Sequence, residues 1–386
     1  MSKIALTNKI VKVSISNLLS LRNVEIELNK LNVFVGPNAS GKSNIVRALQ
    51  LIVNTVRNGV PSLSGYKEFK DIAYGFDETS EINLKIELSI ENRTIIYSLT
   101  LVADNYLEEA WIDNKEALLS NGKSGVMRVL TRHGDLKDYR KSGGMLSSNL
   151  YRGVYRGVLA SLPHDAAKEL HLLAYTLRNI SIHSFTPERL RLRSGVSARP
   201  TLGYYGDNLA RVLLHLYLEN RRAFSSIENV IKSLIPEVEE IIPHIEGSDV
   251  EIWMRVKSLI EPLKPSNISD GTLRILAYVT TLYSGTSLAV FEEPENCIHP
   301  HLLETIVDLA RKAPCQVIMT THSPYLLDHV GINEVFVVEK PGTETMVKKL
   351  SSIEEVKAVR KILEEGGTLG EAWYSGIMGG IPESSE

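Results

Sequence analysis

Cysteine is scarce in this chain of 386 residues, which contains only Cys297 and Cys315. Two cysteines cannot form a disulfide framework, and their spacing is not that of a metal site. Such sparing use of cysteine suits a reducing compartment, so we expect a cytoplasmic protein.

Long apolar runs and a strong excess of one charge are also missing. The sequence contains no stretch near the roughly 20 apolar residues that cross a bilayer. Residues 1–16 never build the apolar core of a signal peptide. The net charge of −3 gives no overall attraction to nucleic acid. We therefore expect no membrane span and no leader, and any contact with DNA would need a local basic patch.

What is present fits a globular α/β protein, with 43% apolar and 23% charged residues. The length exceeds the roughly 100–200 residues of one common domain, which predicts two units. Alternating apolar and polar residues predict an antiparallel β lobe from the segments 10–15, 24–28, 82–90, 94–102 and 107–113. After residue 268, helical and strand patterns alternate, which is typical of a parallel sheet covered by helices.

The middle of the chain has a different pattern. Residues 114–153 are polar and contain several glycines, which favours loops, and helical spacing follows in the segments 164–176, 208–220 and 225–234. We therefore predict a discontinuous α/β core formed by residues 1–113 and 268–386. Residues 114–267 are predicted to be a mostly helical insertion or lid.

A phosphate-binding loop is the strongest motif. It fits the pattern Gly-x4-Gly-Lys-Ser and consists of Gly36, Pro37, Asn38, Ala39, Ser40, Gly41, Lys42 and Ser43, followed by Asn44. The loop lies between an apolar strand, 31–35, and a helical pattern, 44–56, which is the context that this motif requires. Loop amides and Lys42 can hold phosphates, and Ser43 can ligate Mg²⁺. The alternative, a structural glycine turn, does not explain that context.

Acidic residues follow the apolar strand 287–291. Carboxylates at the carboxyl end of a parallel strand lie where open α/β sheets bind ligands. Successive residues point to different sides, so we assign Glu292 to the metal and Glu293 to activation of water. His322, after the strand 316–321, is predicted to contact a γ-phosphate or the attacking water. The alternatives are a solvated acidic turn and a structural histidine.

Together with the segment 268–274, these motifs in this order resemble the ABC-type ATPase heads of the SMC, RecF and OLD group, and in particular the OLD-like ATPases without a nuclease domain. Further resemblance lies in the segments 17–28, 202–209 and 369–376. It implies binding and hydrolysis of ATP with Mg²⁺ in a P-loop NTPase fold. It also implies a head-to-tail homodimer in which Ser269 and Gly271 contact the ATP of the other subunit.

Three smaller expectations come with the resemblance. Arg22 would lie near the nucleotide, unless it is only an exposed turn arginine, and His299 would approach the dimer interface, unless it merely pairs with His301. Such heads usually couple the metal to the helical lobe through a glutamine, but this chain has none between Gln50 and Gln316. Either another polar residue replaces that glutamine or the two lobes communicate differently.

The remaining features concern partners and pathway. A basic cluster consists of Arg189, Arg191, Arg193, Arg199, Arg221 and Arg222. It is either a DNA-binding surface or a solvated face. We expect an ATP-driven switch or motor in DNA repair or phage defence. The alternative is a scaffold or sensor that hydrolyses little ATP and recruits a separate effector such as a nuclease. A small-molecule kinase is disfavoured by the Ser269 segment.

Overall fold

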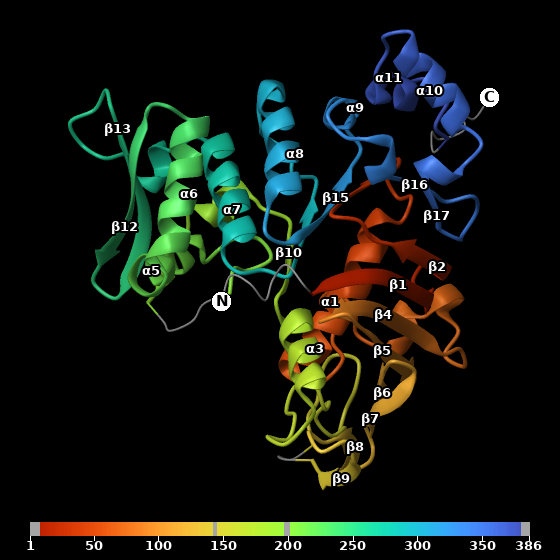
Figure 1. Ribbon diagram of the computed structural model, residues 1–386. Coiled ribbons are helices and arrows are strands. Elements are labelled where there is room, and N and C mark those ends of the chain that lie inside the picture. The colour runs from red at the N-terminus through yellow and green to blue at the C-terminus, as the bar shows by residue number, and fades with distance from the viewer. Residues whose placement is uncertain (1–7, 142–144, 197–200, 380–386) are drawn as a thin grey trace.

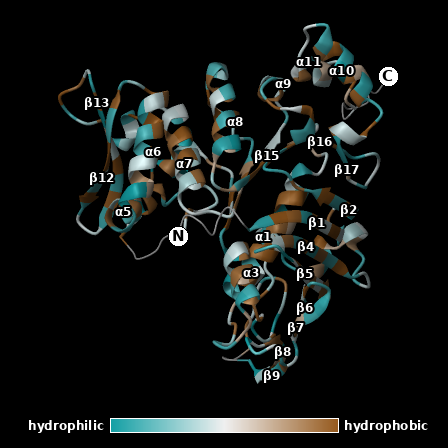
Figure 2. Ribbon diagram, in the orientation of Figure 1, coloured by the Kyte–Doolittle hydropathy of each residue, from teal (hydrophilic) through white to brown (hydrophobic). Residues whose placement is uncertain are grey.

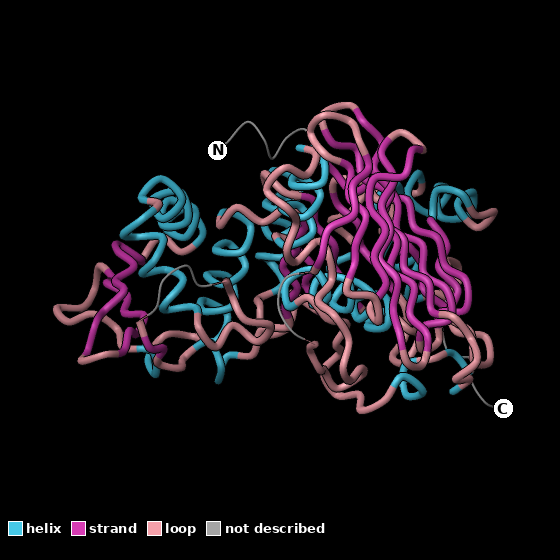
Figure 3. The backbone as a smooth tube through the Cα atoms, turned by 90° about the horizontal axis from the view of Figure 1, so that it is seen from below, coloured by secondary structure: helices cyan, strands magenta, loops and turns pink. Residues whose placement is uncertain are grey.

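The computed structural model describes residues 8–141, 145–196 and 201–379 (Figure 1). Its strands form an eight-stranded sheet, a six-stranded sheet and a three-stranded sheet. Seen from below, the largest sheet forms one broad layer at one end of the molecule, with most helices beside it (Figure 3). Within the described part of the chain, no helix is both long and apolar enough to cross a membrane.

The eight-stranded sheet is antiparallel and has the order β2-β1-β4-β5-β6-β7-β8-β9. Its strands are β1 Lys9–Leu18, β2 Leu21–Glu27, β4 Ile82–Ile90, β5 Arg93–Val102, β6 Asn105–Ile112, β7 Lys115–Asn121, β8 Val126–Leu130 and β9 Leu136–Arg140. The alternation explains the fold: Ile82, Leu84, Ile86 and Leu88 of β4 all point into the core, and the residues between them are exposed or half-buried. The predicted antiparallel lobe is therefore confirmed.

The six-stranded sheet has the order β10-β14-β15-β3-β16-β17. Its strands are β3 Leu31–Val35, β10 Ile180–His183, β14 Leu288–Glu292, β15 Gln316–Thr321, β16 Val335–Glu339 and β17 Met346–Lys349. All neighbours are parallel except β16 and β17. The strand from the first part of the chain, β3, therefore lies between two strands from the last part, β15 and β16.

Two hydrophobic cores meet at this parallel sheet. In β14, Leu288 and Val290 belong to the core shared with the antiparallel sheet, and Ala289 and Phe291 belong to the core under the helical lobe. Helix α1 (Lys42–Asn58) fills the first core between the two sheets, where its apolar residues are brown in Figure 2. Strands buried on both faces read as continuous apolar runs, which is why β3 and β14 are recognisable in the sequence.

The second core lies under the helical lobe. This lobe comprises α4 Pro187–Leu190, β11 Ser194–Gly195, α5 Leu209–Glu219, α6 Arg221–Leu234, β12 Val238–Glu246, β13 Asp249–Val256 and α7 Asp270–Tyr283. The other helices are α2 Phe69–Ile72, α3 Lys168–Arg178, α8 Leu303–Lys312, α9 Pro324–Leu327, α10 Val356–Glu364 and α11 Leu369–Tyr374. Figure 1 shows the helical lobe at left and the antiparallel sheet at lower right, with α8 and β15 between them.

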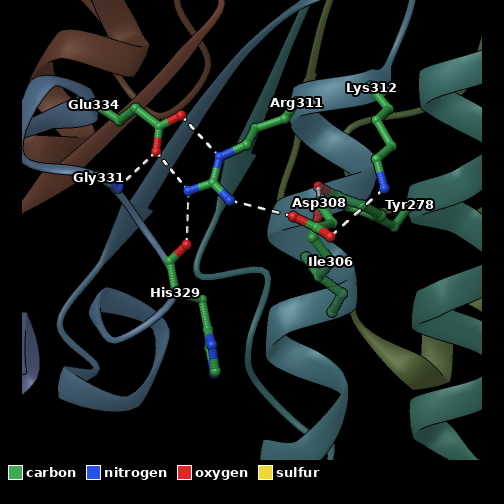
Figure 4. Close-up of polar contacts among 8 residues, drawn as sticks. All are labelled: Tyr278, Ile306, Asp308, Arg311, Lys312, His329, Gly331 and Glu334. Atoms are coloured by element: carbon green, nitrogen blue, oxygen red, sulfur yellow. Dashed lines mark hydrogen bonds and ion pairs between the residues drawn. The ribbon is translucent and has the colours of Figure 1, made fainter.

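Helix α8 is fixed by polar contacts on two sides (Figure 4). On one side, the Arg311 guanidinium donates to both carboxylate oxygens of Glu334, at 2.9 and 2.7 Å, and to the His329 carbonyl at 2.7 Å. On the other, the Tyr278 hydroxyl of α7 donates to the Ile306 carbonyl at 3.0 Å. A bidentate arginine–carboxylate pair restricts orientation as well as distance. It therefore holds α8 against the turn between α9 and β16.

The segment 114–267 differs from the expected mostly helical insertion. Residues 115–140 form β7, β8 and β9, which extend the antiparallel sheet, and β10 is an edge strand of the parallel sheet. Only the part after β10 forms a separate lobe, and that lobe also contains β11–β13. The predicted boundaries at 113 and 268 therefore do not follow the sheets. The polar edge strand β9, for example, is stabilised by its pairing with β8 rather than by an apolar pattern of its own.

Candidate functional site

The predicted phosphate loop joins β3 to α1, and both glycines of its Gly-x4-Gly-Lys-Ser pattern are needed for packing. A Cβ on Gly36 would lie 2.2 Å from the Val338 carbonyl oxygen, and one on Gly41 would lie 2.0 Å from Thr345 Oγ1. Gly41 also has a φ of 106°, in the range that favours glycine. These positions let the loop pack tightly against the end of β16 and the segment before β17.

The Lys42 side chain folds back onto its own phosphate loop. Its Nζ donates to the carbonyls of Gly36 at 2.6 Å and Pro37 at 2.8 Å. Burial lowers the pKa of Lys42, and the carboxylates of Glu293 and Glu295 oppose that shift. The ammonium group is therefore placed at the centre of a loop whose amides can bind phosphate.

Glu292 ends β14 and lies beside the first turn of α1. Ser43 Oγ donates to Glu292 Oε2 at 2.9 Å, and the Tyr204 hydroxyl donates to Oε1 at 2.6 Å. A hydroxyl and a carboxylate this close together are hard oxygen ligands of the kind Mg²⁺ uses when it also binds nucleotide phosphates. Ser43 and Glu292 therefore fit the metal that the sequence implies.

Glu293 points to a different side from Glu292. Its φ is 48°, in the left-handed region, and its amide donates to the Thr320 carbonyl at 2.9 Å. One carboxylate oxygen lies 3.0 Å from His322 Nδ1, and the other accepts from Asn296 Nδ2 at 2.9 Å. A strained backbone that is held by neighbours is common where a side chain must be aimed at a ligand.

The loop and the acidic residues line one crevice of about 660 Å³. The predicted residues on its wall are Asn38, Ala39, Ser40, Gly41, Lys42, Ser43, Asn44, Glu292 and Glu293. Further residues on the wall come from other segments: Arg47, Ser184, Phe185, Thr186, Arg274, Asn296, Thr320 and Lys340. The space lies in the size range of small-molecule sites. The groups that the sequence predicts to bind phosphate, hold a metal and activate water thus share one cavity.

The structure does not bring every predicted residue to this crevice. Ser269 caps α7, where its Oγ accepts from the Thr272 amide at 3.2 Å, and a Cβ on Gly271 would lie 2.9 Å from the Cys297 carbonyl oxygen. Neither Ser269 nor Gly271 is among the described residues on the crevice wall, whereas Arg274 from the same helix is. Within one chain, the start of α7 is therefore separate from the phosphate loop.

Arg22, His299 and the basic cluster also lie elsewhere. Arg22 is 63% exposed and its guanidinium is 3.9 Å from the Glu344 carboxylate. His299 Nδ1 lies 2.6 Å from His301 Nδ1 in an exposed turn. In the cluster, Arg191 pairs with Asp270, and Arg193 pairs with Glu246 and Glu251. Arg221 lies over the Tyr217 ring, and Arg199 lies outside the described residues. The carboxylate partners of Arg191 and Arg193 partly compensate the positive charge that these arginines would present to a phosphate backbone.

A chain of hydrogen bonds that the sequence does not reveal supports the loop from outside. Asn44 Nδ2 donates to Ser20 Oγ at 2.7 Å, and Ser20 Oγ lies 2.6 Å from Thr345 Oγ1. Thr345 Oγ1 in turn donates to the Ser40 carbonyl at 2.9 Å. Connected hydrogen bonds in a buried setting strengthen one another. The segment before β17 therefore fixes the loop.

Tyr204 and Glu295 are two further residues at the site that local sequence patterns do not predict, because their contacts join distant segments. Tyr204 contacts Glu292 from 88 positions away, and Thr321 donates to Glu295 Oε1 from 26 positions away. Burial raises the pKa of Glu295, and its Oε2 is buried without a hydrogen-bond partner. Only the acidic character of the run 292–295 marked Glu295 in the sequence. No local spacing pointed to Tyr204.

Comparisons with known proteins identify relatives of this chain. The model of the family described as "AAA domain, putative AbiEii toxin, Type IV TA system" matches residues 31–328. The chain is 21% identical over 378 residues to an OLD nuclease of Thermus scotoductus. That match covers 91% of this chain and 66% of the relative, so the chain spans just under two thirds of that protein's length.

Solved structures of SMC heads share the fold. An SMC head bound to the C-winged helix domain of ScpA has a TM-score of 0.59 at 13% identity, over 91% of this chain and 99% of that one. An SMC head with an extended coiled coil, bound to the C-terminal domain of ScpA derived from Pyrococcus furiosus, has a TM-score of 0.53 at 14% identity, over 93% and 99%. The predicted fold, an ABC-type ATPase head with a parallel core sheet, an antiparallel β lobe and a helical lobe, is confirmed.

Proposed function

Because the chain belongs to the family described as "AAA domain, putative AbiEii toxin, Type IV TA system", we propose that it binds ATP with Mg²⁺ in this crevice and hydrolyses it. One observation carries the proposal. Lys42, Ser43, Glu292 and Glu293, which come from opposite ends of the sequence, line a single cavity. A phosphate loop and a strand-end carboxylate pair in one cavity are the parts that phosphoanhydride hydrolysis requires.

Each group has a distinct task in this proposal. The loop amides and Lys42 bind the β- and γ-phosphates, and Ser43 and Glu292 hold Mg²⁺. When bound, the metal neutralises the charge that develops on the phosphates. Glu293 orients the attacking water and accepts its proton, and His322, 3.0 Å from Glu293 Oε1, keeps that carboxylate in position.

We further propose a head-to-tail homodimer with ATP at the interface. Ser269 and Gly271 start the helix α7, whose amides and dipole favour an anion. These residues do not line the crevice of their own chain. A second copy could therefore present them to the γ-phosphate, and hydrolysis would then release the pair. DNA repair or phage defence remains the proposed setting for such a switch.

The test uses Glu293→Gln, which keeps the size of the side chain but removes the base. General-base catalysis contributes about 10²–10⁴-fold to rate. We expect phosphate release to fall by at least 100-fold, ATP binding to persist, and light scattering to show a dimer with ATP. The matched control is Glu304→Gln, because Glu304 is an exposed glutamate on α8.

Two results would overturn parts of the proposal. Wild-type protein that binds ATP but releases no phosphate would replace the hydrolase with a nucleotide-gated scaffold that recruits a separate effector. A Glu293→Gln protein that stays monomeric with saturating ATP would remove the sandwich dimer. Equal loss of activity in Glu304→Gln would show that the effect of Glu293→Gln is not specific to the site.

A further inference from the structure

The carboxylate proposed to hold the metal has one hydrogen-bond donor on each oxygen. Ser43 donates to Glu292 Oε2 at 2.9 Å from the phosphate loop, and Tyr204 donates to Oε1 at 2.6 Å from the opposite side. Two donors on opposite oxygens determine the rotation of a carboxylate about its last bond. Tyr204 is thus one of two residues that orient Glu292.

The turn that carries Tyr204 is tightly held. The Gly206 amide donates to the Gly203 carbonyl at 3.0 Å, and Gly206 has a φ of 81°. Asn208 accepts from the Gly203 amide and donates to the Thr201 carbonyl, both at 2.7 Å. These three hydrogen bonds hold the backbone on both sides of Tyr204 in place. The position of the turn therefore dictates the position of the hydroxyl.

The same turn is attached to two different parts of the molecule. The Ser184 amide donates to the Tyr204 carbonyl at 2.9 Å, which ties the turn to the end of β10 in the parallel sheet. On the other side, Asn208 directly precedes α5, which packs against α6, β12 and β13 of the helical lobe. The turn that carries Tyr204 therefore connects the helical lobe to β10, the strand beside β14, and a shift of the lobe would act on this connection.

The helical lobe also carries the proposed contact with a second copy. Helix α6 packs against α7, and the Arg191 guanidinium donates to the Ile268 carbonyl at 2.7 Å, just before Ser269. A continuous set of packed elements thus joins the start of α7 to Tyr204. This connection links the helical lobe to the proposed metal site without the coupling glutamine that ABC-type heads usually have.

We propose that Tyr204 is the positioning residue through which the helical lobe sets the orientation of the Glu292 carboxylate and, with it, the hold of the site on Mg²⁺ and nucleotide. The inference rests on the proposed function and adds to it the residue that links lobe and metal site. Hydrogen bonds to metal-binding carboxylates typically change metal affinity or activity by about 10–100-fold. A tyrosine that only fills space would lack this effect.

The experiment compares Tyr204→Phe with Tyr205→Phe. Both remove one hydroxyl from neighbouring tyrosines. Tyr205 is 48% exposed, and within the described ranges Glu292 accepts from Tyr204 and not from Tyr205. Binding of a fluorescent ATP analogue is titrated with Mg²⁺ and repeated in EDTA. We expect Tyr204→Phe to need about 10–100-fold more Mg²⁺ for half-maximal binding. Its affinity in EDTA and that of Tyr205→Phe should match wild type.

A second variant tests the link to the lobe. Asn208→Ala removes two tethers of the turn without touching Glu292, and we expect a Mg²⁺ requirement between those of wild type and Tyr204→Phe. Unchanged Mg²⁺ dependence in Tyr204→Phe would overturn the positioning role, as would an equal loss of affinity in EDTA. A wild-type response from Asn208→Ala would overturn transmission through the turn. Wild-type protein that binds no nucleotide at any Mg²⁺ concentration would instead refute the proposed function on which the inference rests.

Discussion

Replacing Thr345 with valine should weaken nucleotide binding, although Thr345 lies outside the phosphate loop. The Thr345 hydroxyl donates to the Ser40 carbonyl at 2.9 Å and contacts Ser20 Oγ at 2.6 Å. In a trans peptide the carbonyl and the following amide point in opposite directions. The bond to Ser40 therefore also orients the amide of Gly41, one of the groups expected to face phosphate. Valine keeps the shape of threonine and removes the hydroxyl, and with it both of these contacts.

The size of the effect follows from burial. Thr345 is 1% exposed, so water cannot replace the lost donor at the Ser40 carbonyl. An orphaned buried hydrogen-bonding group costs about 1–3 kcal/mol, which corresponds to roughly 5–150-fold in an equilibrium constant. If the freed peptide rotates to find another partner, this cost appears as reduced ATP affinity. If it cannot rotate, the cost appears as a lower free energy of unfolding.

Both quantities can be measured on the same protein, by isothermal titration with ATP and by urea denaturation. Thr343→Val is the matched control, because Thr343 lies on the same connection but is exposed, with its hydroxyl 3.1 Å from the Tyr74 hydroxyl. We expect Thr345→Val to lose affinity, stability or both within the stated range, and Thr343→Val to lose neither. Wild-type behaviour of Thr345→Val in both assays would refute the bracing role.

Two further predictions concern pH and the start of α7. Burial lowers the pKa of His183 to about 4, below its unfolded value of about 6.5. Between these two values the imidazole is protonated in the unfolded chain and neutral in the native chain. The free energy of unfolding should therefore fall by about 2 kcal/mol from pH 7 to pH 5, and urea denaturation should show a smaller fall for His183→Asn; equal slopes would contradict this assignment. Ser269→Ala should lose about 0.5–2 kcal/mol of stability, because the cap of α7 is lost. Light scattering should show that this variant no longer forms a dimer with ATP. A normal dimer would mean that Ser269 only caps α7.

Local features of the sequence were enough to place the central parts of the crevice. The strand Leu31–Val35, its loop and the helix after it are adjacent in the chain, and each has a distinct pattern of apolar residues and glycine. The strand before Glu292 is equally clear, because it is buried on both faces. Parallel pairing then brings strand ends to one edge, which is why distant motifs could be expected in one crevice.

The parts that could not be predicted depend on contacts between distant segments. Thr345 contacts Ser40 across 305 positions and Tyr204 contacts Glu292 across 88, and neither residue belongs to a periodic pattern. The polar segment 136–140 is predicted to be a loop, but it forms the strand Leu136–Arg140, whose side chains are nearly all exposed. It is paired with β8 through its backbone, and backbone pairing leaves no trace in the order of polar and apolar residues.

The central place of β3 in the parallel sheet affects how the protein is made. Asn32 Nδ2 donates to the Val317 carbonyl across 285 positions of the chain. A ribosome that adds about 5–20 residues per second needs on the order of tens of seconds to bridge that interval. During this time the strand that carries the phosphate loop has no neighbour in its sheet. Chains that terminate early should therefore be prone to aggregation through this apolar strand, and nucleotide binding should begin only after β15, the strand Gln316–Thr321, has been synthesised.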